Sequence, residues 1–249
     1  MAIEVFNRYE NKYILDTFTY IKVRGDLSQR MELDAYNRGG ACYTICNLYY
    51  DTGDSALIRT SLGKPKYKEK LRLRAYGVPA LHDMVFVEIK KKVNGIVNKR
   101  RTQMKLSEAY AFLAARQKPE IKPYMNEQVV NEILYLIRRI DLAPKTYLAY
   151  DRIAYFDKEN RGLRISFDAN IRARREDVRL ELGSGGKRLM EPQLWLMEIK
   201  AENALPYWVT DMLAKHQVYS TSFSKYGTEY KNYLAKNLRE ERIPCSISY

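Results

Sequence analysis

The sequence is poor in the residue types on which many catalytic sites depend. Its 249 residues include only two histidines, His82 and His216, and three cysteines. A mechanism built on a histidine base or a histidine-ligated metal is therefore poorly supported. Cys42 and Cys46 have no nearby Cys/His pair to complete a zinc site, and an odd cysteine count argues against a disulfide scaffold. We expect free thiols in a reducing compartment.

Long hydrophobic runs and linkers are missing too. No apolar stretch approaches the ~20 residues that cross a bilayer, and the first residues, MAIEVFNRYENKY, are too charged for a signal-peptide core. We therefore expect a soluble, cytoplasmic protein. No segment rich in Pro, Gly or Ser divides the chain, and no repeat of fixed period occurs. This predicts a single domain over residues 1–249, with a core from about residue 5 to 235.

Positive charge, in contrast, is abundant. The formal net charge is +13 and the isoelectric point is near 9.5, a balance that attracts nucleic acid, phospholipid, nucleotide or polyphosphate. The 21 tyrosines could serve as stacking platforms for single-stranded nucleic acid. Most of them alternate within predicted strands or helices, as core and rim residues do. No nucleic-acid partner is expected.

Two-residue alternation predicts a structure dominated by strands. The strands are expected at residues 8–16, 43–50, 68–76, 84–92, 97–105, 147–156, 163–173 and 194–202, with hairpin turns at 93–95 and 160–162. Helices are expected at 108–116 with Ser107 as N-cap, at 126–141, after Pro206 and at 228–237. The predicted class is α+β: a mainly antiparallel β-structure with helices packed on its outside.

Basic side chains recur on one side of these strands. In LRLRAYG, Arg72 and Arg74 share a face, and in LRISFDANIRAR the alternation puts Arg164, Arg172 and Arg174 together. A half-exposed sheet with a solvated charged face explains any single strand. A closed barrel whose charged faces line a hydrated tunnel explains the recurrence. Cations crowded in a tunnel would repel one another unless a multivalent anion or metal–phosphate complex lay among them.

The order of eight segments makes the sequence similar to a known family. RYENKY, YTICNLYYDT, KLRLRAYG, FVEIKKK, YDRIAYF, LRISFDANIRAR, LMEIKAENALPYWV and SFSKYG resemble the VTC domain, the polyphosphate polymerase domain of vacuolar transporter chaperone proteins. That domain belongs to the CYTH or triphosphate tunnel metalloenzyme superfamily. The resemblance implies a closed antiparallel β-barrel that binds triphosphate through basic side chains and a divalent cation.

The resemblance also implies roles for individual residues. The catalytic cations would be Lys12, Arg72, Arg74, Lys90, Arg152, Arg164, Lys200 and Lys225. Further substrate-binding residues would be Lys99, Arg101, Tyr150, Ser224, Glu10 and Asp168. Glu198 would bind Mn²⁺ or Mg²⁺, with Glu88 as a second candidate ligand. For Glu10, Glu88 and Asp168, ion pairing is the commoner role.

The implied function is ATP-dependent synthesis of polyphosphate, in which the γ-phosphoryl group moves to a growing chain. A metal-dependent triphosphatase and a non-catalytic polyphosphate-binding domain stay open as alternatives. The hydrolytic branch carries ExExK on its first strand, where this chain has Arg8, Glu10 and Lys12, so the pattern favours the VTC branch. A second departure is Ser222, where the family has a basic residue; it leaves acceptor or product binding at that end open. Expected partners are ATP, polyphosphate or triphosphate, phosphate or sulfate ions in the tunnel, and a possible separate membrane protein.

A glycine-rich segment, GSGGKR at 183–188, resembles a phosphate-binding loop only superficially. The P-loop requires a Lys followed by Ser or Thr and then a helix. Here Arg188 follows the lysine, and LMEP follows Arg188. We interpret the segment as a surface loop.

Overall fold

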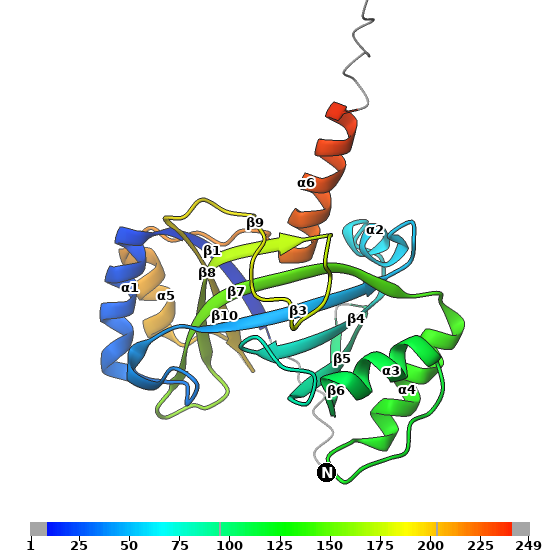
Figure 1. Cartoon of the computed structure of the whole chain (residues 1–249). Helices are drawn as coiled ribbons and strands as arrows, with labels where there is room; N and C mark the ends of the chain where they lie inside the picture. Colours follow the sequence, from blue (N-terminus) through cyan, green and yellow to red (C-terminus); the bar gives the residue numbers. More distant parts are fainter. Residues whose placement is uncertain (1–8, 95, 203, 241–249) are drawn as a thin grey trace, which may run out of the picture.

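The computed structural model describes residues 9–94, 96–202 and 204–240, and its centre is a ten-stranded antiparallel sheet (Figure 1). The strands run in the order β1-β10-β8-β7-β3-β4-β5-β6, while the short β2 and β9 pair with β7 and β8. The long strands are β1 (Tyr9–Asp16), β3 (Tyr43–Asp51), β4 (Tyr67–Tyr76), β5 (Met84–Val93), β6 (Ile96–Lys105), β7 (Ala143–Asp157), β8 (Arg164–Arg174) and β10 (Leu194–Ala201). Every strand predicted from alternation is present. The short strands β2 (Met31–Leu33) and β9 (Lys187–Arg188) were not predicted, because so few residues carry no alternation.

The α+β prediction is confirmed, but the closed barrel is not. In the described residues β1 pairs only with β10 and β6 only with β5, so no hydrogen-bonded ladder joins the two edges. The edges nevertheless converge, because the Glu10 carboxylate of β1 interacts electrostatically with Lys90 of β5. The sheet is therefore curled but open, as expected from the accumulated twist of long antiparallel strands.

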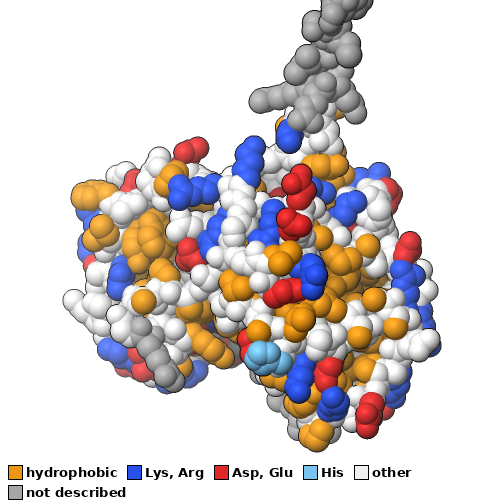
Figure 2. All heavy atoms as spheres, viewed as in Figure 1, with side chains coloured by type: hydrophobic (Ala, Val, Ile, Leu, Met, Phe, Trp, Pro, Cys, Tyr) orange, Lys and Arg blue, Asp and Glu red, His pale blue; other side chains and the backbone are white. Residues whose placement is uncertain are grey.

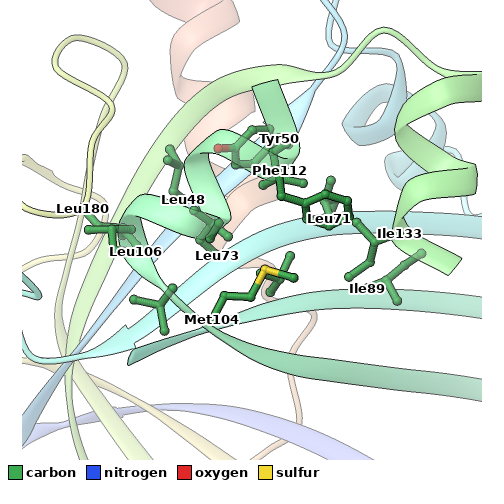
Figure 3. Packing of buried hydrophobic residues seen from close by; sticks show 14 of the residues in the cluster. Leu48, Tyr50, Leu71, Leu73, Ile89, Met104, Leu106, Phe112, Ile133 and Leu180 are labelled. Carbon is green, nitrogen blue, oxygen red and sulfur yellow. The ribbon is translucent and has the colours of Figure 1, made fainter. Parts of the chain in front are cut away.

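One hydrophobic core lies on the outer face of β3–β6, where it is covered by α3 (Leu106–Ala115) and α4 (Glu127–Arg139) (Figure 3). On α4, Ile133 and Ile137 belong to the buried stripe that the 3.6-residue spacing predicts. Asn126 caps this helix by accepting a hydrogen bond from the backbone N–H of Val129 at 3.2 Å. The N-cap predicted for α3 is wrong: Ser107 lies inside the helix. Instead, the Glu108 carboxylate accepts from the backbone N–H of Lys105.

A second core covers the outer face of β1, β10 and β8. Here α1 (Thr17–Arg30) and α5 (Tyr207–Lys215) bury Val23, Leu27 and Val209 against the sheet. Helix α1 was not predicted, because its sequence mixes polar residues and Gly25 with few apolar positions. Asp16 fixes its start by accepting from the backbone N–H of Thr19 at 2.7 Å.

A third core lies on the concave face, at one end of the sheet. It joins α2 (Ala56–Leu62) and α6 (Lys225–Glu240) to the sheet through buried Ile58, Leu148 and Tyr226. Asp51 ties both helices together, since it accepts from the backbone N–H of Ile58 and from the Tyr226 hydroxyl. Helix α6 begins at Lys225 rather than at 228 and projects away from the sheet (Figure 1). None of the helices in the described residues combines the length and apolar character that crossing a bilayer requires.

The alternation of β8 breaks at a β-bulge. Opposite Tyr150, β8 supplies two residues, and Asn170 adopts a positive φ of 48°. The extra residue turns Arg172 and Arg174 to the outer face. There Arg172 pairs with Asp151, and Arg174 stacks 3.6 Å from the centre of the Tyr147 ring. The single charged face predicted for LRISFDANIRAR therefore ends at Asp168.

The glycine-rich segment is followed by a strand, not by a helix. β9 (Lys187–Arg188) pairs with β8, and Gly183 and Gly186 adopt positive φ values in the loop before it. This confirms that GSGGKR is not a phosphate-binding P-loop. Figure 2 shows that basic, acidic and hydrophobic side chains are interspersed over the viewed surface. The outer surface on this side thus carries no single basic patch.

Candidate functional site

The strand register places the predicted cations of separate strands on one concave face. Cross-strand partners connect this face from β1 to β6: Lys12 lies opposite Glu198, Arg152 opposite Asp168, Arg72 opposite Glu88, and Lys90 opposite Lys99. By the same register and alternation, the face also carries Glu10, Arg74, Arg101, Tyr150, Arg164 and Lys200. Arg8, the first residue of the motif on β1, lies outside the described residues.

Two buried carboxylates hold the cations at the centre of this face. Asp168 receives a bidentate hydrogen bond from Arg152, at 2.6 and 2.8 Å, and lies 2.6 Å from the Lys225 ammonium. Glu198 lies 2.8 Å from Lys225, 3.6 Å from Arg152 and 3.5 Å from Lys200. Both carboxylates are almost inaccessible to water. Burial raises their pKa values, but Arg152, Lys225 and Lys200 outweigh it and hold both below the ordinary range.

A second carboxylate organises the cations of β4–β6. Glu88, which is 2 % exposed, lies 2.8 Å from Arg72, 3.8 Å from Arg74 and 2.8 Å from Lys99. Burial raises its pKa, but these three cations lower it well below the ordinary value. Glu88 therefore stays ionised, and its oxygens are engaged by Arg72 and Lys99. This geometry favours the ion-pair role for Glu88.

Tyr150 connects the two groups of cations. Its hydroxyl accepts from Arg74 at 3.3 Å, while Arg152 and Lys225 lie 5.1 and 4.6 Å from the centre of its ring. A ring face attracts cations on both sides because of its quadrupole. Cations from β4, β7 and α6 thus meet around one aromatic side chain.

The remaining predicted residues lie around this centre. Lys12 donates to the backbone carbonyl of Phe223 and lies 3.3 Å from Glu10. Ser224 accepts from the backbone N–H of Gly227, so it caps α6 and positions Lys225. Two residues sit further out: Arg164 pairs with Asp34, and the exposed Arg101 lies 4.4 Å above the Phe86 ring.

Sequence reasoning missed three residues of this face. Lys70 is one alternation before Arg72 in KEKLRLR, and Asn47 and Tyr49 alternate on β3, so the same pattern could have identified all three. Asn47 accepts from Arg74 at 3.0 Å, and Tyr49 accepts from Arg72 at 2.9 Å. Burial raises the pKa of Tyr49, but Arg72 and Lys70 bring it down to about 8.

The electrostatics of the face indicate a shortage of negative charge. Burial and the neighbouring Arg74 and Arg72 lower the pKa of Lys99 to about 7, although Glu88 opposes them. Burial, Lys90, Lys68 and Arg72 lower the pKa of Lys70 to about 8, although Tyr49 opposes them. An ammonium group that gives up its proton this readily is one that an anion would stabilise.

The affinity for a polyanion should consequently fall as the pH rises through the pKa of Lys70. The anion favours charged Lys70, and at pH 9 only about one Lys70 in ten is charged, so affinity loses up to about tenfold between pH 7 and 9. Calorimetric titration with inorganic tripolyphosphate and EDTA measures this loss. The Lys70→Arg variant stays charged and cancels the ligand's own titration. An equal loss of affinity in both proteins would contradict the expectation.

A divalent cation fits this face only with help from its ligand. In the part of the chain that the structure describes, no three His, Cys, Asp or Glu side chains group as a metal site. Glu198 and Glu10 interact electrostatically, and Glu10 is the more accessible of the two. One or two carboxylates completed by phosphate oxygens and water are a usual Mg²⁺ environment. The donor set therefore fits a metal bound together with phosphate.

Comparison with solved structures supports the fold. A candidate adenylate cyclase of Bacillus halodurans superposes with a TM-score of 0.51 at 13 % identity, covering 86 % of this chain and 92 % of that one. A candidate adenylyl cyclase of Hippeastrum, described as having a dominant triphosphatase activity, gives a TM-score of 0.47 at 13 % identity, covering 90 % of this chain and 95 % of that one. No curated protein sequence matches this chain at a significant level.

Comparison with protein families is more specific. The family model of the VTC domain matches residues 7–234, which include every strand described above. The eight motifs that resemble this family all overlap the matched range. The chain therefore belongs to the VTC domain family, within the CYTH or triphosphate tunnel superfamily.

Proposed function

We propose that this protein is an ATP-dependent polyphosphate polymerase. The observation that carries the proposal is the convergence of Arg and Lys side chains from separate strands and from α6 on one concave face. Membership of the VTC domain family supports the same function. A linked row of phosphates supplies the negative charge that this face lacks.

The reaction requires positioning and charge stabilisation more than proton transfer. A terminal oxygen of the polyphosphate chain attacks the γ-phosphorus of ATP, the bond from that phosphorus to the β–γ bridging oxygen breaks, and ADP leaves. The charge of the loose transition state is spread over phosphoryl oxygens, where Arg and Lys side chains act. Arg72, Arg74 and Arg152 offer planar donors for phosphate, and Lys225 offers a point charge.

No protein base is needed, because the attacking oxygen is already ionised. The two histidines agree with this: His82 is largely exposed, and His216 pairs with Asp26 at 2.8 Å on the α1–α5 side. Glu198 and Glu10 would hold Mn²⁺ or Mg²⁺, which would neutralise charge on the phosphates.

A product assay tests the proposal. Purified protein with ATP and Mn²⁺ or Mg²⁺ is expected to form acid-stable phosphate polymer, with one ADP released for each phosphate incorporated. Gel electrophoresis of the polymer and chromatography of the nucleotide give both quantities. Release of orthophosphate without polymer would replace the proposal with a triphosphatase. Tight polyanion binding without turnover under either metal would replace it with a binding domain.

A further inference from the structure

A cluster of aromatic side chains lies at the end of the concave face where β3 and β5 begin and β4 ends. We call it the aromatic rim; it consists of Tyr36, Tyr43, Tyr76 and Phe86. Tyr36 and Tyr76 stack almost in parallel, with ring centres 4.8 Å apart and an interplanar angle of 8°. Tyr43 lies 5.6 and 5.9 Å from these two rings, and Phe86 meets Tyr76 edge-on at 6.1 Å.

The rim is open to solvent, unlike the three cores. Tyr36 is 58 % and Tyr76 36 % exposed, so the stacked pair presents aromatic surface to water. It also adjoins the phosphate-binding cations: Phe86 is the cross-strand partner of Arg74, and Tyr43 is the cross-strand partner of Arg152. A ligand that filled both regions would need a flat apolar part and a polyanionic part.

Polar groups without partners lie beside these rings. The Tyr43 hydroxyl and the Nε of Arg164 are both buried and without a hydrogen-bond partner among the described residues. They lie in one neighbourhood, since Arg164 and Asp34 both act electrostatically on the Tyr43 hydroxyl. Asp34 bonds Arg164 at 2.8 Å and accepts from the backbone N–H of Tyr36 at 3.2 Å. Buried donors left unpaired are costly and usually mark a missing ligand or water.

We propose that the aromatic rim binds the nucleoside of ATP. The purine stacks on the exposed surface of Tyr36 and Tyr76, and the ribose hydroxyls bond to Tyr43, Arg164 and Asp34. The triphosphate then extends past Arg74 and Arg152 into the concave face. This inference rests on the proposed function and deepens it, because it assigns the donor to the class of purine nucleoside triphosphates rather than inorganic triphosphate, which has no group for the rim.

The test compares two ligands that share a triphosphate and differ in the nucleoside. Binding of ATP and of inorganic tripolyphosphate is measured by calorimetry in EDTA, without turnover. Tyr36→Ala and Tyr76→Ala should each weaken ATP binding about tenfold, the usual scale for losing one base–aromatic stack. Their affinity for tripolyphosphate should change less than twofold. Tyr36→Phe keeps the ring and should keep ATP affinity.

Controls separate this inference from the proposed function. Tyr207→Ala, at an 84 % exposed tyrosine that begins α5, should leave both affinities unchanged. Equal losses for both ligands, or unchanged ATP binding in both rim variants, would overturn the nucleoside site. A selective loss of ATP affinity in a protein that makes no polymer would uphold the nucleoside site and refute only the polymerase.

Discussion

Replacing Glu198 with glutamine is expected to lower turnover about a hundredfold without weakening metal-free binding of tripolyphosphate. The substitution keeps the size of the side chain and removes one negative charge from among Lys12, Lys200, Lys225 and Arg152. A hundredfold loss corresponds to about 2.7 kcal/mol of transition-state stabilisation, within what a catalytic metal supplies. Without metal, the variant face is more positive, so tripolyphosphate should bind as tightly or more tightly.

Steady-state kinetics over a Mn²⁺ series, with calorimetry in EDTA, separate these effects. The matched control is Glu69→Gln: Glu69 is also a buried glutamate paired with an arginine, Arg139, but it faces away from the concave side. The control should keep normal turnover. If Glu198→Gln lost metal-free affinity and turnover in equal measure, Glu198 would be a scaffold for the cations and not a metal ligand.

The Asp168→Ala variant is expected to lose about 3–5 kcal/mol of unfolding free energy. Asp168 is fully buried and neutralises both Arg152 and Lys225. Its removal leaves two cations buried without their partner, which costs far more than the loss of one hydrogen bond. Chemical denaturation, read by circular dichroism, measures the change.

Ligand rescue makes this prediction specific to the site. Tripolyphosphate brings negative charge to the same cations, so it should raise the melting temperature of the variant by more than that of the unmodified protein. Asp54→Ala is the matched control, since it breaks an exposed pair with Arg59 and should change stability immeasurably. Equal ligand stabilisation of both proteins would show that polyphosphate binds away from Asp168.

Much of the concave face could be predicted because strand alternation is a local property. Arg72 and Arg74, or Glu198 and Lys200, share a face whatever the rest of the chain does. Which strands become neighbours is not local: the contact of Lys225 with Asp168 depends on where α6 docks. The resemblance to the VTC domain placed Lys225 in the site, and residue spacing alone could not have done so.

The failures also have physical causes. The closed barrel was inferred from convergence of charge, but convergence needs only a curled sheet, and a ladder needs matched edges. Ser107 was expected as an N-cap because serine favours that position, yet α3 begins one residue earlier and Glu108 satisfies the helix start. Lys70 was overlooked although its alternation was visible, because its motif was read as beginning at Arg72.

The bulge at Asn170 shows that chain length, as well as composition, sets the charge inside the sheet. Arg164 and Asp168 lie before it and face inward, whereas Arg172 and Arg174 lie after it and face outward. Deleting one residue there would restore strict alternation and rotate two guanidinium groups inward without any substitution. Relatives that gain or lose a residue at this position could thus differ sharply in how many linked phosphates they grip, even with identical arginines.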